Sequence, residues 1–186
     1  MNEKHFAVDI RRSYEYTLER QAENLEIPYC FDYTYSFDTD EGNRYIFLVQ
    51  EFMDCNLIGL KFYRATDYEN KNKYNVLTHH KNPFRFFSTI INVIFLEVIQ
   101  KFPNHSFIFK GEPTLKELEE IEDCENNSKR FKFYLRLLAE VVSPLRYEVK
   151  VKIDKSVALY INKSTSNDTL KKIEDLLISY GLVLGA

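Results

Sequence analysis

The stretch of sequence that decides the fold is FRFFSTIINVIFLEVIQKF, residues 84–102. Apolar side chains would cover nearly every side of a helix formed by this stretch, which is typical of a helix enclosed by other elements. Pro83 suits the first turn of a helix, where no backbone N–H is needed. The short apolar segment Ser106–Lys110 follows almost directly. We therefore expect a long buried helix at about Phe84–Phe102 in the centre of the fold, leading into a strand.

The sequence before this helix predicts an antiparallel meander. From Tyr29 onward the residues alternate with period two and are rich in aromatic rings, as on half-buried strands. A polar turn at 38–43 leads into a second strand over 44–52, and a third is expected at about 57–65. Residues 6–27 fit both helical and strand spacing. We favour the helix, so that residues 1–28 form an N-terminal arm or helix.

Three helices and two strands are expected after the central strand, at about 114–124, 128–142 and 168–180 and at 147–153 and 157–161. The strand pattern is clearest at Tyr147, Val149, Val151 and Ile153, which alternate with charged residues and so predict one buried face. The expected fold class is α+β. In it an antiparallel twisted sheet, made of the N-terminal meander and a C-terminal hairpin, packs on the long helix and two or three further helices, with residues 29–186 as a single domain.

Length and composition fit a packed domain of the reducing cytosol. A chain of 186 residues can bury one core without metal or disulfides. Its formal net charge of −3 gives no overall attraction to nucleic acid or anionic lipid. The three cysteines show no Cys-x-x-Cys pair and are expected to be reduced thiols. No apolar signal segment follows the N-terminus, and residues 90–99 are too short to span a bilayer. We therefore expect a cytoplasmic protein without membrane contact.

A narrow polar arc on the long helix is the first candidate for a binding surface. It consists of Arg85, Ser88, Thr89 and Asn92, which fall on one side at helical spacing. On a helix that is otherwise apolar, such an arc is where a partner or ligand could be contacted.

The polar loop before the helix is the second candidate surface. Lys71, Lys73 and Lys81 lie there among tyrosines, a combination that can neutralise phosphates and stack on bases. A solvated loop explains the same residues, so both interpretations stay open.

Common catalytic and metal-binding patterns are absent from the sequence. The pair His79-His80 has no further ligand at metal-binding spacing, and the turn with Asp38, Asp40 and Asn43 lacks the twelve-residue calcium pattern. No Gly-x-Ser-x-Gly motif marks a nucleophile, and the five glycines do not cluster before a helix to cradle phosphate. We expect no catalytic residue, no metal and no cofactor.

The order of the expected elements is similar in outline to the fold of the large acetyltransferase family whose members use coenzyme A. In that family a loop of the form Gln/Arg-x-x-Gly-x-Gly/Ala at the start of the long helix binds the pyrophosphate. The matching place here reads KNPFRFF, residues 81–87, with no glycine. The resemblance implies the topology and an acyltransferase-like enzyme or relic, while the sequence departs from the family at the cofactor loop.

A second resemblance is to small bacterial proteins of unknown function, often encoded near mobile elements. It rests on the hairpin YSFDTDEGNRY, residues 35–45, the helix that Thr89 opens, and RFKFY at residues 130–134. The likeness covers roughly residues 33–140 and assigns no residue a role.

The sequence favours a non-catalytic interaction or regulatory protein from a bacterium or phage, which binds a protein partner. The alternative is an acyltransferase-like enzyme, and a third reading is an RNA- or DNA-binding protein. A homodimer is compatible with each of them.

Overall fold

The protein is described from a computed structural model, which defines residues 13–27, 29–70, 82–111, 129–139 and 142–182. Its strands are β1 (Tyr16–Glu23), β2 (Cys30–Asp38), β3 (Arg44–Phe52), β4 (Leu57–Arg64), β5 (Ser106–Lys110), β6 (Tyr147–Lys152) and β7 (Val157–Asn162). Its α-helices are α1 (Pro83–Asn92), α2 (Lys129–Ala139) and α3 (Asn167–Ser179).

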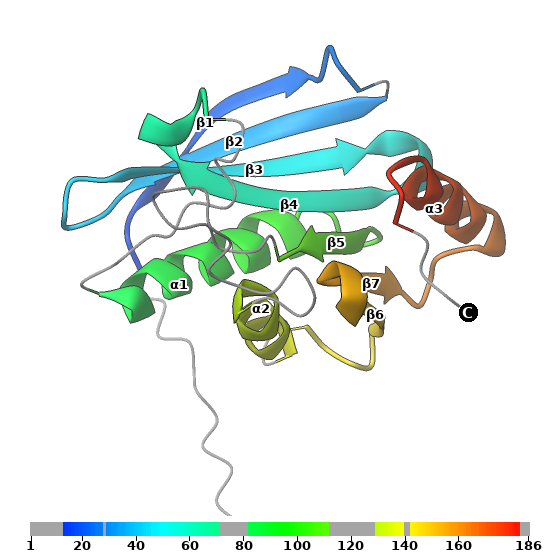
Figure 1. Cartoon of the computed structure of the whole chain (residues 1–186). Coiled ribbons are helices and arrows are strands. Elements are labelled where there is room, and N and C mark those ends of the chain that lie inside the picture. Colours follow the sequence, from blue (N-terminus) through cyan, green and yellow to red (C-terminus); the bar gives the residue numbers. More distant parts are fainter. Residues whose placement is uncertain (1–12, 28, 71–81, 112–128, 140–141, 183–186) are drawn as a thin grey trace, which may run out of the picture.

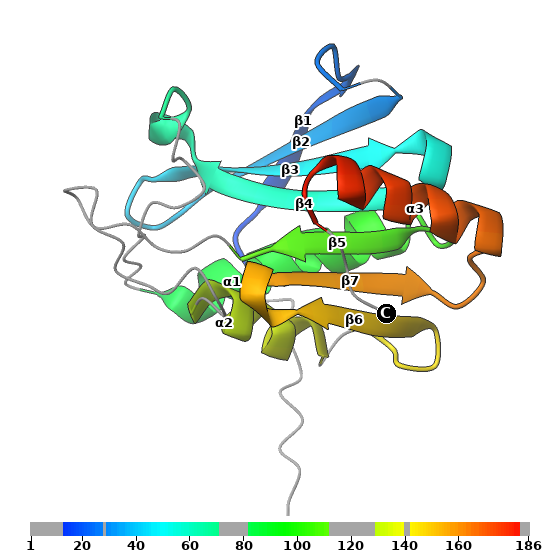
Figure 2. The same ribbon diagram turned by 45° about the vertical axis from the view of Figure 1, so that its right-hand side comes forward.

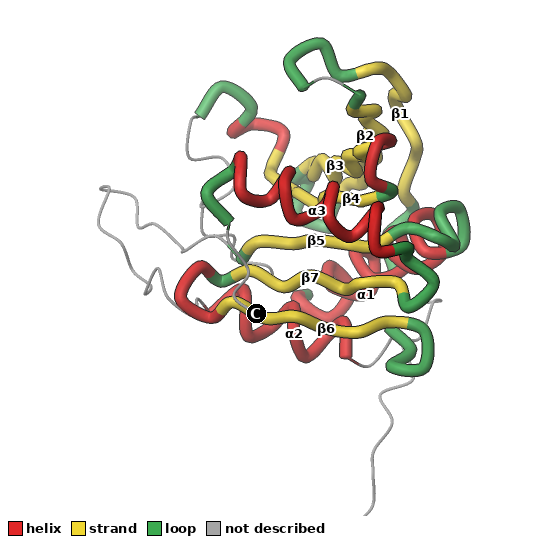
Figure 3. Tube along the Cα trace, turned by 90° about the vertical axis from the view of Figure 1, so that its right-hand side faces the viewer, coloured by secondary structure: helices red, strands yellow, loops and turns green. Residues whose placement is uncertain are grey.

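The seven strands form one mostly antiparallel sheet in the order β1-β2-β3-β4-β5-β7-β6. Among the described strands only the pair β4 and β5 is parallel, and α1 lies in the connection between these two strands. Figure 3 shows the twist that accumulates between β1 and β6. The α+β class and the N-terminal meander are therefore confirmed.

Two hydrophobic clusters lie on opposite faces of the sheet. Helices α1 and α2 cover one face, and α3 covers part of the other (Figures 1 and 2). The larger cluster joins the aromatic rows of β2 and β3 to α1 and α2, with Tyr35, Phe47, Phe86 and Phe131 almost wholly buried. The smaller cluster lies under α3 and is centred on Ile173. The dense aromatic alternation of the meander thus supplies one face of the main core.

The expected long α-helix is wrong in its second half. Only Pro83–Asn92 is α-helical, and Val93–Ile99 continues as a π-helix. A π-helix pairs each residue with the fifth one along, which widens the turn and rotates the side chains that follow. Apolar periodicity does not distinguish the two forms, because both bury one broad face.

The helix favoured for residues 6–27 is also wrong where the structure describes it. Tyr16–Glu23 is the edge strand β1, paired antiparallel with β2 and irregular between Leu18 and Arg20. Pairing with the open edge of β2 outweighs the weak local preference. Residues 1–12 and the whole of the expected helix at 114–124 lie outside the described residues.

The last part of the chain follows the predicted elements, with one difference. Strands β6 and β7 and helix α3 occur where expected. Ser166 caps α3 by accepting a hydrogen bond from the Thr169 N–H at 3.2 Å. The expected buried face of β6 is wrong, however, because Val149 and Val151 are 46% and 44% exposed.

Candidate functional site

The polar arc of α1 lies largely inside the protein. Thr89 and Asn92 are 0% and 3% exposed, while Arg85 and Ser88 are half-buried. Two of the four residues therefore offer no surface to a partner, and the contacts of Arg85 and Thr89 show what the arc binds instead.

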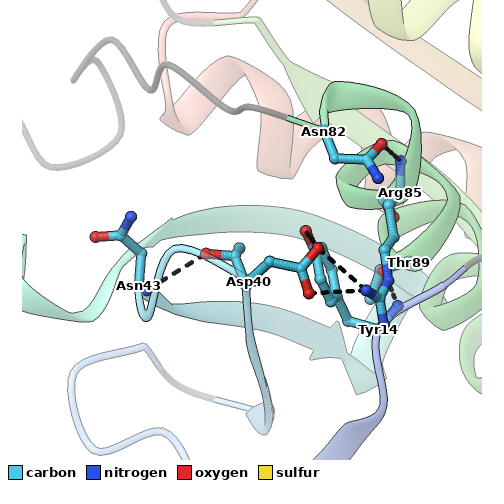
Figure 4. Close-up of polar contacts among 7 residues, drawn as sticks. Tyr14, Asp40, Asn43, Asn82, Arg85 and Thr89 are labelled. Carbon is cyan, nitrogen blue, oxygen red and sulfur yellow. Dashed lines mark hydrogen bonds and ion pairs between the residues drawn. The ribbon is translucent and has the colours of Figure 1, made fainter.

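Arg85 connects the start of α1 to the β2–β3 turn through an ion pair (Figure 4). Its Nη1 donates to both carboxylate oxygens of Asp40, at 2.8 and 3.1 Å. The Tyr14 hydroxyl donates to the same carboxylate at 3.3 Å. The guanidinium carbon of Arg85 lies 4.2 Å from the centre of the Tyr14 ring. Cation, carboxylate and ring thus form one compact contact between three separate segments.

Thr89 holds the backbone that leads into β1 (Figure 4). Its Oγ1 accepts a hydrogen bond from the Tyr14 N–H at 2.7 Å and donates to the Arg85 carbonyl at 2.9 Å. One turn earlier, the side chain of Asn82 caps α1 by accepting from the Arg85 N–H at 3.2 Å.

The same side of the helical segment continues to Glu97, which accepts from the Tyr16 hydroxyl at 3.1 Å. Burial and this carboxylate raise the pKa of Tyr16 to about 12, so its hydroxyl stays protonated and donates. We call Arg85, Thr89 and Glu97 with Tyr14 and Tyr16 the N-terminal seam. The arc that the sequence predicts as a binding surface therefore contacts other segments of the same chain through Arg85 and Thr89.

The second candidate surface lies outside the described residues. Lys71, Lys73 and Lys81 belong to the segment that the structure does not describe, as do His79 and His80. The nucleic-acid reading therefore remains a prediction. Within the described ranges, no group of three His, Cys, Asp or Glu residues could hold a metal ion.

A half-buried acid–base cluster, which no sequence pattern indicated, lies at the end of β3, with the Glu51 and His105 side chains 15% exposed. Glu51 accepts from the Tyr33 hydroxyl at 2.9 Å and lies 3.1 Å from Nε2 of His105. Burial lowers the pKa of His105, although the neighbouring carboxylate opposes this effect. The imidazole is therefore neutral near pH 7 and donates its Nε2–H to Glu51. Among the described residues its Nδ1 has no hydrogen-bond partner. This atom is also buried, so the cluster joins β2, β3 and the turn before β5 rather than facing a substrate.

The start of α1 offers few groups to an anion. Pro83 has no N–H, and the N–H groups of Arg85 and Phe86 donate to the side chain and the carbonyl of Asn82. Of the N–H groups in this first turn, these bonds leave that of Phe84 to bind an anion. The Phe84 side chain is 79% exposed. A phosphate at this helix start would meet far fewer donors than a glycine-rich loop provides.

The turn between β1 and β2 presents apolar side chains to solvent. Leu25 is 95% and Tyr29 63% exposed, and Met53 of the adjoining 3₁₀ turn is 45% exposed. The Met53 N–H donates to the Tyr29 carbonyl at 3.0 Å, which places these two residues side by side. We call Leu25, Tyr29 and Met53 the apolar tip.

A polar network fixes the backbone of this turn. The side-chain oxygen of Asn24 accepts from the N–H groups of Glu26 and Ile27, both at 2.9 Å. Its amide nitrogen donates to Asp32 at 2.8 Å. Asp32 also accepts from Gln50 at 3.2 Å. The turn that carries Leu25 is thus anchored to β2 and β3.

Comparison of the chain with models of known protein families, with curated proteins and with solved structures finds no match. In the described part of the chain, none of the helices is both long and apolar enough to cross a membrane.

Proposed function

We propose that this protein is a non-catalytic interaction domain that binds a protein partner through the apolar tip. The observation that carries the proposal is the exposure of three large apolar side chains, Leu25, Tyr29 and Met53, at one end of the sheet. Tyrosine and methionine are enriched in protein interfaces, and exposed apolar clusters commonly mark them.

The backbone of Tyr29 gives this proposal independent support. Its φ is +54°, a conformation that is unfavourable for a bulky residue. Hydrogen bonds on both sides hold it there, from the Asn24 N–H to the Cys30 carbonyl and from the Met53 N–H to the Tyr29 carbonyl. Such strain persists where the surroundings enforce it, often at binding sites. The ring remains 63% exposed, so packing within the chain is a poor explanation for it.

The charges around the tip indicate the chemistry of the partner. Three acidic residues are exposed around the tip. Glu23 lies at the end of β1, Glu26 in the turn that follows it, and Asp54 next to Met53. A complementary partner would have an apolar pocket with lysine or arginine at its rim. Burial of the three apolar side chains would supply most of the affinity, and the acidic residues would set orientation and association rate.

The test compares variants of the full chain in quantitative pull-downs from its native host. Tyr29→Gly removes the ring and suits the positive φ, and Leu25→Ser removes the second side chain. We expect both variants to lose a partner that the wild type retains. The matched control is Tyr180→Ser, which removes an exposed aromatic ring at the end of α3. Identical retention by wild type and tip variants, all with native melting temperatures, would overturn the proposal.

A second candidate function is that of an acyltransferase-like protein. It is favoured by the order in which β4, α1, β5 and α2 precede the pair β6 and β7, the order on which the resemblance to the acetyltransferases rests. The capped, glycine-free start of α1 argues against it. A thermal-shift assay with acetyl-coenzyme A tests it, because a ligand at 100 times its Kd adds about 2.7 kcal/mol to stability. No shift at saturating cofactor would exclude this candidate.

A further inference from the structure

The apolar face of β6 is left uncovered along most of its length. Tyr147 is buried and its ring packs 5.5 Å from that of Phe107, between ring centres. Along the same face, Val149 and Val151 are 46% and 44% exposed, and Ile153, in the 3₁₀ turn that follows the strand, is 56% exposed. The main core therefore ends in an apolar strip that reaches the solvent.

Strand β6 is also an edge of the sheet. It is last in the strand order and pairs only with β7 among the described strands (Figures 2 and 3). Edge strands that remain solvated usually carry charges, bulges or proline on the exposed side. The charges of β6 are confined to one face, at Glu148, Lys150 and Lys152. The other face of this regular six-residue strand carries valines at 149 and 151, and its register is unbroken. An open edge with an apolar face is suited to pair with another strand.

The backbone groups available at this edge follow from the pairing with β7. The Lys163 N–H donates to the Arg146 carbonyl at 2.9 Å, just beyond the pair of Tyr147 with Asn162. In an antiparallel pair the residues that face the partner alternate. The N–H and C=O groups of Val149 and Val151 therefore point away from β7. The strand thus offers apolar side chains and free backbone groups at the same positions.

We propose that the occupant of this edge is a second copy of the chain, paired antiparallel through β6 across a two-fold axis at Lys150. In this register Val149 of each copy lies opposite Val151 of the other. Glu148 of each copy lies opposite Lys152 of the other, which gives two attractive cross-strand pairs on the opposite face. The two seven-stranded sheets become one continuous sheet.

The sequence of β6 favours a second copy over an unrelated strand because it is self-complementary. An isologous interface requires each contact to occur twice, and the valine and Glu–Lys pairs meet that condition. One contact in this register is unfavourable, because the two Lys150 side chains, which have the same charge, meet at the axis. Moving the axis to Val151 would place Lys150 opposite Lys152 twice, and moving it to Val149 would place Lys150 opposite Glu148. Lys150→Thr therefore tests the proposed register against an axis at Val149, and Lys152→Glu tests it against an axis at Val151, where the change would strengthen the dimer.

This dimer goes beyond the proposed function, since it uses the β6 edge of the sheet, whereas the apolar tip lies at the turns from β1 to β2 and from β3 to β4. Its test is the oligomeric state of the purified full chain, measured by sedimentation equilibrium over a range of concentrations. We expect a dimer in the wild type and a monomer for Val151→Lys. We expect Lys150→Thr to tighten the dimer, because the like-charge contact at the axis is lost. A weaker dimer for Lys150→Thr would contradict this register.

A charge-swap experiment provides the matched control. Glu148→Lys and Lys152→Glu each turn two attractive pairs into repulsive ones and should weaken the dimer about tenfold. The double variant restores opposite charges and should recover the wild-type dissociation constant. Circular dichroism and melting temperature confirm that each variant folds. A wild type that is monomeric at all concentrations, or a dimer that Val151→Lys leaves intact, would overturn the inference without affecting the test of the apolar tip.

Discussion

Arg85 donates to both carboxylate oxygens of Asp40, at 2.8 and 3.1 Å, although 45 positions separate the two residues in the sequence. The contact connects α1 to the β2–β3 turn, beside the segment that leads into β1. The N-terminal seam thus fastens an edge strand to the central helix, and its contribution to stability can be measured.

Replacing Arg85 should cost more stability than replacing Asp40. Arg85→Ala removes both an ion pair, worth about 0–1 kcal/mol at an exposed site, and the stacking on Tyr14, worth about 0.5–1 kcal/mol. Asp40→Asn removes the ion pair and leaves an amide oxygen that can still accept from the Tyr14 hydroxyl. Urea unfolding should show a loss of about 0.5–2 kcal/mol for the first variant and under about 1 kcal/mol for the second. Equal losses would mean that the ring contact contributes nothing.

The hydroxyl of Thr89 should matter more than its methyl group. Thr89→Val leaves the buried Tyr14 N–H without an acceptor and should lower the free energy of unfolding by about 1–3 kcal/mol. Thr89→Ser keeps the hydroxyl and is the matched control, with a smaller loss. Hydrogen exchange at Tyr14 should accelerate in the valine variant only. Similar exchange in both variants would show that this hydrogen bond does not hold the segment.

Stability should fall in acid partly through His105. Burial lowers the pKa of its imidazole in the folded protein below the ordinary value of 6.5, so the unfolded chain takes up a proton more readily. Above about pH 6.5 the imidazole is neutral in both the folded and the unfolded chain, so His105 does not reduce the stability. As the pH falls below about 6.5 the unfolded chain binds the proton first, and the stability decreases. The measurement is the unfolding free energy between pH 7.5 and 5 for wild type and His105→Gln. The two pH profiles should run parallel above the unfolded pKa and diverge below it, and profiles that stay parallel throughout would contradict the assignment.

The two described cysteines should be unreactive in the folded protein. Burial raises the pKa of Cys30 to about 12 and that of Cys55 to about 11. Since the thiolate is the reactive form, a disulfide reagent at pH 8 should not label either residue until the chain unfolds. The experiment uses a Cys124→Ser background, so that only these two thiols are counted. Rapid labelling of the native chain would show that one of them is exposed by local opening.

Replacing Gly111 by alanine should destabilise the protein more than replacing Gly181, because the two glycines are required for different reasons. A Cβ at Gly111 would lie 2.6 Å from backbone atoms of Phe131, so alanine there pushes α2 away from the sheet and should cost about 1–3 kcal/mol or more. At Gly181 nothing lies within 4 Å, but φ is +69°, and alanine should cost only about 1 kcal/mol. Urea unfolding compares the two variants. Equal losses would contradict the close contact between α2 and Gly111.

Local patterns predict the elements whose form is decided by near neighbours. Ser106–Lys110 is a strand with the predicted bounds, and α3 begins at Asn167 after its Ser166 cap, one residue before the expected start. The alternation over β2 and β3 correctly predicts strands rich in aromatic residues, and the structure places every second one in the core because alternate residues of a paired strand face the same side.

The sequence of residues 6–27 could not decide between helix and strand, because its periodicity fits both. The open edge of β2 decides it, through pairs such as Tyr16 with Phe37. The π-helical turn at Val93–Ile99 has the same kind of origin, since its apolar side chains would suit either helix.

The chain itself therefore determines the α+β class, the aromatic core and the apolar face of β6, since these depend on residue type and spacing over a few positions. Tertiary structure alone decides whether each face is buried or exposed. It buries Thr89 against the backbone of Tyr14, which lies 75 positions away in the sequence, and it leaves Val149 and Val151 exposed on an edge strand of the sheet. The physical reason is that burial depends on which distant element arrives at a face, and hydrophobic periodicity describes only the face that is offered.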